Sequence, residues 1–122
     1  MLKKQKGFTL IEVLFSLIIF AVGLLAIAGM QITSIKGNHF SSNVTQAAVL
    51  AQNKLEYLKN LSFEDPKLDG GQPPEQINES GIVFAVEYGV VLVGNYMKKI
   101  TATVQWTDQV NHSISLSTIR SK

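Results

Sequence analysis

The chain has 122 residues, with 11 Lys and Arg against 9 Asp and Glu and a formal net charge of +2. Lys3, Lys4 and Lys6 supply three of the positive charges, so the side chains of the rest sum to −1. This balance argues against a basic nucleic-acid-binding surface, and no nucleic acid is expected as a partner. Because the chain has no cysteine and only His39 and His112 as histidines, a zinc site is not expected either.

A long apolar segment follows the lysines. Residues 13–30 contain Ser16 as their only polar side chain, and a run of roughly eighteen such residues lies at the short end of the bilayer-spanning range. Such a segment satisfies its backbone hydrogen bonds in lipid as a helix, and the preceding lysines favour a cytoplasmic N-terminus. We therefore expect a single transmembrane helix over residues 8–36.

Glu12 lies within this apolar surrounding. A carboxylate at the centre of a membrane helix costs about 2.5–3.5 kcal/mol on insertion scales. If the chain were cut after Gly7, the new amine of Phe8 would lie about one helical turn away. An ammonium–carboxylate pair would reduce the cost for both groups, within one chain or between neighbours. The alternative is a Glu12 that is protonated or extends to the headgroups.

Residues 7–12, Gly-Phe-Thr-Leu-Ile-Glu, together with the short Lys-rich leader, resemble the class III signal of type IV prepilins and pseudopilins. The resemblance implies that a prepilin peptidase removes residues 1–7, cutting between Gly7 and Phe8, and methylates the amine of Phe8. Phe8, Thr9 and Glu12 would then serve assembly, with Glu12 as the docking carboxylate. A competing interpretation is an ordinary signal peptide cleaved after Ala28, because residues 26–28 read Ala-Ile-Ala.

The helix is expected to continue to about Asn60, because no proline interrupts the sequence before Pro66. Gly23, Gly29 and Gly37 are points where it could bend. Beyond the membrane segment, apolar residues recur at helical spacing and predict one stripe that packs on a sheet. The stripe comprises Val44, Ala47, Ala48, Ala51, Leu55 and Leu58, whereas polar residues such as Asn43 and Lys54 are expected mostly elsewhere.

Residues 62–81 are expected to form a loop, because Pro66, Gly70, Gly71, Pro73 and Pro74 punctuate them. Five carboxylates make this segment acidic: Glu64, Asp65, Asp69, Glu75 and Glu79. A calcium site is an alternative to a solvated loop, although the spacing fits no EF-hand.

The C-terminal part has the alternation of an antiparallel sheet. Residues 82–88 and 90–93 are rich in β-formers, with Gly89 as a possible bulge, and residues 99–106 and 113–117 alternate. We expect Ile100, Ala102, Val104 and Trp106 to face the core together with Ile114 and Leu116. Core packing of Trp106 is favoured over ligand stacking. Lys98, Lys99 and His112 are expected at the solvated surface.

Residues 99–108 and 112–121, and the helix segment 21–31, resemble the corresponding parts of PilV-type minor pilins. The implied fold is α+β: a long N-terminal helix on a small antiparallel sheet of three to four strands, with residues 37–122 as an extracellular or periplasmic head. The implied function is that of a low-abundance structural subunit that primes or modifies a type IV pilus.

The expected partners are the prepilin peptidase and methyltransferase, other major and minor pilins, the inner-membrane assembly platform and the inner membrane itself. A pseudopilin of type II secretion is the alternative within this architecture, and a soluble exported binding module released after Ala28 is the alternative of another class. Neither a cofactor nor a catalytic residue is expected, because no nucleophile elbow, phosphate-binding loop or dinucleotide fingerprint is present.

Overall fold

The computed structural model describes residues 7–122, and its longest element is helix α1 (Leu10–Lys59). The helix continues through Gly23, Gly29 and Gly37, so the expected single helix is confirmed. Two compact units share it: one extends to Phe40 and the other comprises Ser41–Lys122. The leader lysines Lys3, Lys4 and Lys6 lie outside the described residues.

Within the first unit, the described side chains of residues 7–40 are all exposed. An 18-residue window of α1 has a mean hydropathy of 2.8, and none of it is buried. The helix is therefore long and apolar enough to cross a membrane, a property that secretory signal sequences share. So much exposed apolar surface is unfavourable in water, and it is expected to be covered by lipid or by other protein chains.

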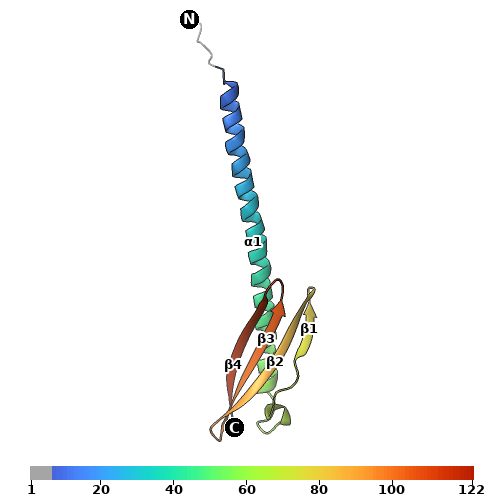
Figure 1. The fold of residues 1–122 in the computed structure, drawn as a ribbon. Coiled ribbons are helices and arrows are strands. Elements are labelled where there is room, and N and C mark those ends of the chain that lie inside the picture. Colours follow the sequence, from blue (N-terminus) through green and yellow to red (C-terminus); the bar gives the residue numbers. More distant parts are fainter. Residues whose placement is uncertain (1–6) are drawn as a thin grey trace. The chain divides into compact units, whose positions relative to one another are not determined.

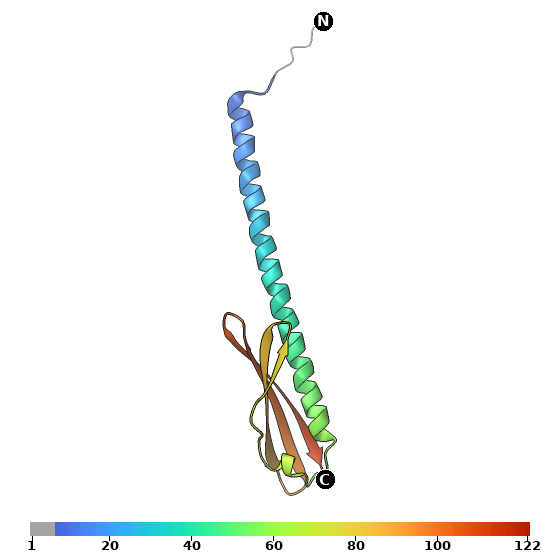
Figure 2. The ribbon, with the colours of Figure 1, turned by 90° about the vertical axis from the view of Figure 1, so that its right-hand side faces the viewer.

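The second unit contains a four-stranded antiparallel sheet in the order β1-β2-β3-β4 (Figure 1). Its strands are β1 (Glu75–Glu79), β2 (Ile82–Val93), β3 (Met97–Thr107) and β4 (Asn111–Ser121). The second half of α1 lies along one face of this sheet (Figure 2). The α+β arrangement expected from the sequence is confirmed.

The core of this unit lies between the helix stripe and the inner face of the sheet. Ala47 and Ala51 are fully buried on α1, and their small side chains allow the backbone to approach the strands. The residues of β3 that were predicted to face inward are buried: Ile100, Ala102, Val104 and Trp106. Phe84, Val86 and Tyr88 of β2 are buried with them. Ile114 and Leu116 pack against this core from β4, as expected.

Asn43 departs from the expectation for polar residues on α1. It is 7% exposed and extends the buried row of Ala47, Ala51 and Leu55 by one turn. Residues four apart lie on one helix face, so the position of Asn43 is set by helical periodicity and not by its polarity.

The expected loop over residues 62–81 is wrong in its second half, where β1 forms. The sequence of β1, Glu-Gln-Ile-Asn-Glu, contains one apolar residue and no alternation that would predict a strand. A two-residue turn of Ser80 (φ 53°) and Gly81 (φ 83°) joins it to β2, with Glu79 paired to Ile82. Positive φ at both central positions suits the right-handed twist of a hairpin. The Ser-Gly pair was therefore the available signal for β1.

Gly89 forms no bulge. The β2–β3 register runs without interruption from Tyr88–Ala102 through Gly89–Thr101 to Val90–Ile100. A bulge would place two residues of β2 opposite one of β3, so this expectation is wrong, and β2 is one regular strand of 12 residues.

Lys98 is buried, not solvated. It is 5% exposed, and its Nζ donates to the Phe63 carbonyl oxygen at 2.8 Å and to Asp69 Oδ1 at 3.0 Å. The ammonium also lies 4.7 Å from the centroid of the Phe63 ring. This cluster, which we call the Lys98 clasp (Lys98, Phe63 and Asp69), ties the connection after α1 to strand β3. A charged side chain is tolerated there because its donors have partners.

His112 is half-buried and not at the open surface. Its ring stacks on Trp106 at a centroid distance of 5.3 Å, and its Nε2 lies 3.1 Å from Asp108 Oδ1. Trp106, 4% exposed, also contacts Phe84, with ring centroids 5.9 Å apart. These contacts confirm Trp106 as a core residue.

Candidate assembly site

Helix α1 begins at a cap formed by Thr9. The Thr9 hydroxyl oxygen accepts a hydrogen bond from the Glu12 backbone N–H at 3.3 Å, and the Thr9 carbonyl accepts from the Val13 N–H at 3.2 Å. A Thr at this position satisfies one of the helix N–H groups that lack an intrahelical partner. Thr9 therefore sets the start of the helix. As a result, Glu12 lies in the first turn.

Glu12 occupies the first turn of α1, where the positive end of the helix dipole favours a carboxylate. Its side chain is exposed. The pattern Thr9-x-x-Glu12 matches a capping box, in which a Ser or Thr cap is followed three residues later by Glu. Of the two bonds of such a box, the structure shows the one from the Glu12 backbone N–H to the Thr9 hydroxyl, a cap that was not predicted from the sequence above.

Phe8 and Glu12 lie on the same side of the helix start. Both line a shallow hollow on the surface of α1, together with Ser16 and Phe20 one and two turns further along. The Ser16 hydroxyl donates a hydrogen bond to the backbone carbonyl oxygen of Glu12 at 2.9 Å and not to its carboxylate. An ammonium placed at this face would meet a carboxylate surrounded by apolar side chains.

Gly7 and Phe8, the expected processing residues, precede the helix and are exposed, with 81% of Phe8 accessible. Exposed backbone outside a helix or strand is the preferred site of proteolysis. The structure thus brings Phe8, Thr9 and Glu12 together at one helix end.

The acidic residues of the connection after α1 do not gather into a metal site. Asp69 pairs with Lys98 at 3.0 Å, and Glu75 with Lys54 at 3.2 Å. Asp65 Oδ1 accepts from the Lys67 backbone N–H at 2.9 Å and caps the short helix η1 (Pro66–Leu68). Within residues 7–122, no group of three or more His, Asp or Glu side chains is arranged to hold a metal ion.

A second feature concerns the β3–β4 turn. Asp108 Oδ1 accepts hydrogen bonds from the backbone N–H groups of Gln109 and Val110 and lies beside His112. These bonds, the one from Gln109 first, lower the pKa of Asp108 below its ordinary value of 3.8. Asp108 therefore stabilises the turn. Its contact with His112 explains the position of the His112 ring without a ligand-binding role.

Comparison with known families gives one match. Residues 2–28 match the prokaryotic N-terminal methylation motif. No curated protein and no solved structure matches the chain.

The motif covers the leader, the processing residues and the first part of α1. It implies processing by a prepilin peptidase and assembly with other pilins into a pilus or a secretion-system fibre. It points to a structural subunit and not to an enzyme. Together with the exposed apolar helix, it supports a type IV pilin-family or pseudopilin protein that is anchored in the inner membrane before assembly.

Proposed function

We propose that the chain is a minor structural subunit of a type IV pilus. Prepilin peptidase cuts it between Gly7 and Phe8 and methylates the Phe8 amine. Residues 8–36 hold the processed subunit in the inner membrane, and residues 37–122 form its periplasmic or surface-exposed head. The assembly platform then transfers it into the fibre beside other pilins, where it primes or modifies assembly.

The observation that carries this proposal is the position of Glu12. Its exposed carboxylate lies in the first turn of a helix whose apolar surface is unburied, on the side that Phe8 shares. A lone carboxylate in such a surrounding costs about 2.5–3.5 kcal/mol, and an ammonium would offset part of this cost. A free Phe8 amine, in the same chain or in a neighbour, is that ammonium.

Processing is tested by the intact mass and N-terminal sequence of the protein from its native host. We expect a chain that starts at methylated Phe8. Gly7→Leu should block leader removal, because the side chain crowds the bond to be cut, whereas Lys4→Gln should leave it intact. A mature chain that starts at Gly29 would refute the proposal, because cleavage after Ala28 removes Glu12 altogether.

Docking is tested by the amount of the subunit in sheared fibres. Glu12→Ala should leave cleavage largely intact and lower incorporation at least about tenfold, since removing one partner of a buried ion pair costs about 3–5 kcal/mol. Ser16→Ala, on the same helix face, is the matched control and should be incorporated normally. Equal incorporation of Glu12→Ala and the wild type would refute the docking role.

The PilV-type assignment rests on the resemblance of residues 21–31, 99–108 and 112–121 to that subgroup. A pseudopilin of type II secretion remains a second candidate, because the methylation motif is common to both kinds of subunit. Deletion of the gene separates them: loss of surface fibres supports the pilus subunit, and loss of exoprotein secretion supports the pseudopilin.

A further inference from the structure

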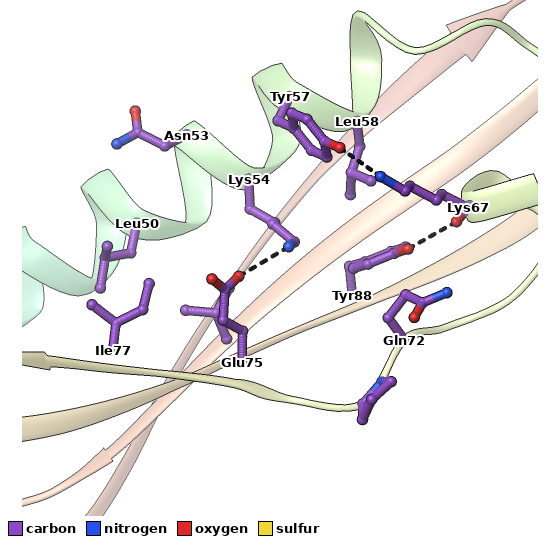
Figure 3. A pocket seen from close by; sticks show the side chains of 12 residues that line it. Leu50, Asn53, Lys54, Tyr57, Leu58, Lys67, Gln72, Glu75, Ile77 and Tyr88 are labelled. Carbon is purple, nitrogen blue, oxygen red and sulfur yellow. Dashed lines mark hydrogen bonds and ion pairs between the residues drawn. The ribbon is translucent and has the colours of Figure 1, made fainter. Parts of the chain in front are cut away.

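The second unit contains a cleft between the C-terminal part of α1, the connection at residues 67–73 and strands β1 and β2 (Figure 3). Its volume is about 680 Å³, within the range of about 300–1,000 Å³ that small-molecule sites occupy. None of its lining residues belongs to the membrane segment or to the Phe8–Glu12 site.

On α1 the cleft is lined mainly by residues beside the buried stripe. Ala47 and Ala51 are fully buried, whereas Lys54 and Tyr57 line the opening. On the opposite wall, β1 is a short edge strand in which only Ile77 is half-buried. The fold therefore leaves a space at the β1 edge that the chain's own side chains do not fill.

The connection at residues 67–73 packs closely against β2. A Cβ on Gly71 would lie 3.1 Å from the Tyr88 carbonyl oxygen, which is tighter than ordinary packing, so glycine permits this approach. The Tyr88 hydroxyl donates to the Lys67 carbonyl at 2.9 Å. Burial raises the pKa of Tyr88, so this donor stays protonated. These contacts fix Lys67 at the rim of the cleft.

Two ammonium groups point into this space. Lys54 Nζ lies 5.9 Å and Lys67 Nζ 5.4 Å from the centroid of the Tyr57 ring, and Lys54 lies 5.5 Å from that of Tyr88 (Figure 3). Glu75 is the one carboxylate among the lining residues, and it pairs with Lys54 at 3.2 Å. The lining thus carries one net positive charge.

Lys67 carries the positive charge that no carboxylate of the lining pairs with. Its Nζ donates to the Tyr57 hydroxyl at 2.8 Å, a neutral partner, and within residues 7–122 no ion pair of Lys67 is formed. Asp65, whose carboxylate accepts from the Lys67 backbone N–H, is not a lining residue, but its charge also contributes to raising the pKa of Lys67. The hydrogen bond with Tyr57 raises the pKa of Lys67, so the group is charged at neutral pH. An ammonium has three donors, and two remain for a ligand.

Apolar surface lies next to these donors. The half-buried Leu50 and Ile77 contribute aliphatic surface, Pro73 also lines the cleft, and the lining residues Leu58 and Val86 are buried. A mostly apolar lining with a few convergent polar groups is the usual composition of a small-molecule site. The Lys67 ammonium favours an anionic group, and the aliphatic lining favours an apolar or aromatic body attached to that group.

We propose that this cleft binds a small organic ligand in which one carboxylate or phosphate group is joined to an apolar or aromatic body. The anion contacts Lys67 and Tyr57, and the apolar body lies against Leu50 and Ile77. The site shares no residue with the membrane segment or the Phe8–Glu12 site, so a binding test on the single chain can fail or succeed apart from the proposed function.

The test uses the full chain in nonionic micelles, with tyrosine rings labelled for NMR. The chain has three tyrosines: Tyr57 and Tyr88 line the cleft, and Tyr96, 70% exposed and outside it, is an internal control. The probes are 3-phenylpropionate, phenyl phosphate and the neutral 3-phenylpropanamide. We expect saturable shifts of Tyr57 and Tyr88 with the anionic probes, with a Kd of about 1–10 mM for so small a ligand.

Variants localise the binding. Lys67→Gln should weaken binding of the anionic probes about tenfold, the effect of losing one charge-assisted hydrogen bond, and Lys67→Arg should retain most of it. Lys99→Gln, an exposed lysine on β3 outside the cleft, should have no effect. The stronger of the two anionic probes identifies the headgroup. Absence of saturable shifts, equal shifts with the neutral amide, or unchanged binding in Lys67→Gln with an intact spectrum would overturn the proposal.

Discussion

Replacement of Lys98 by methionine tests the clasp that holds the connection after α1 to the sheet. Methionine keeps the apolar stem but removes the donors to the Phe63 carbonyl and to Asp69. Asp69 is 66% exposed, so its pairing contributes at most about 1 kcal/mol. Loss of the carbonyl's partner adds about 1 kcal/mol or more, and loss of the cation–π contact adds about 0.5–1 kcal/mol.

The expected loss is therefore about 2–3 kcal/mol of unfolding free energy. For a unit of this size, each kcal/mol lowers the Tm by about 4–8 °C, so Lys98→Met should unfold at least about 8 °C below the wild type. Trp106 is the only tryptophan and is 4% exposed in the core. When the full chain is unfolded thermally in micelles, the fluorescence of Trp106 reports on unfolding of the head and not of the membrane helix.

Two further variants separate the components of the clasp. Lys99→Met, on the exposed face of β3, should change stability by no more than about 0.5 kcal/mol. Asp69→Asn should cost no more than about 1 kcal/mol. The reasoning would be refuted if Lys98→Met were no more destabilising than Lys99→Met. If Asp69→Asn matched the full loss, the contribution assigned to Phe63 would be wrong.

Three other predictions follow from local geometry. Thr9→Val should cost about 1 kcal/mol of helix stability at the N-terminus, seen as faster amide exchange at Glu12, while Thr9→Ser should restore protection. Gly81→Ala should destabilise the head by about 1 kcal/mol or more because φ is +83°. Gly89→Ala should be neutral or stabilising, because a Cβ there has open space and φ is ordinary. Equal effects of the two variants on stability would contradict the assigned turn. Asp108 should titrate below pH 3.8 in the folded protein. Because its folded pKa is depressed, its contribution to stability is present above its unfolded pKa and disappears as the pH falls through the folded pKa, and Asp108→Asn should abolish this acid dependence.

The order of the major elements was predictable from the sequence because each has a strong local signal. The apolar run after Glu12 and the later row of Ala47, Ala51, Leu55 and Leu58 specify a long helix with two environments. The alternation from Ile100 to Trp106 specifies a strand with one buried face. The Gly7-Phe8 junction and Glu12 were recognisable because residue type and spacing define that motif without any tertiary contact.

Several features could be decided only in the folded chain. β1 carries no apolar alternation, and although the Ser80–Gly81 pair marks a turn, the extent of β1 follows from its pairing with β2. Lys98 has the sequence context of a surface lysine, yet the connection after α1 covers it and supplies Phe63 and Asp69 as partners. The cleft at the β1 edge joins Lys54, Lys67 and Tyr88, which are distant in sequence. Local patterns record which face of an element is apolar, whereas burial of a charge and convergence of side chains depend on which segments the fold places beside one another.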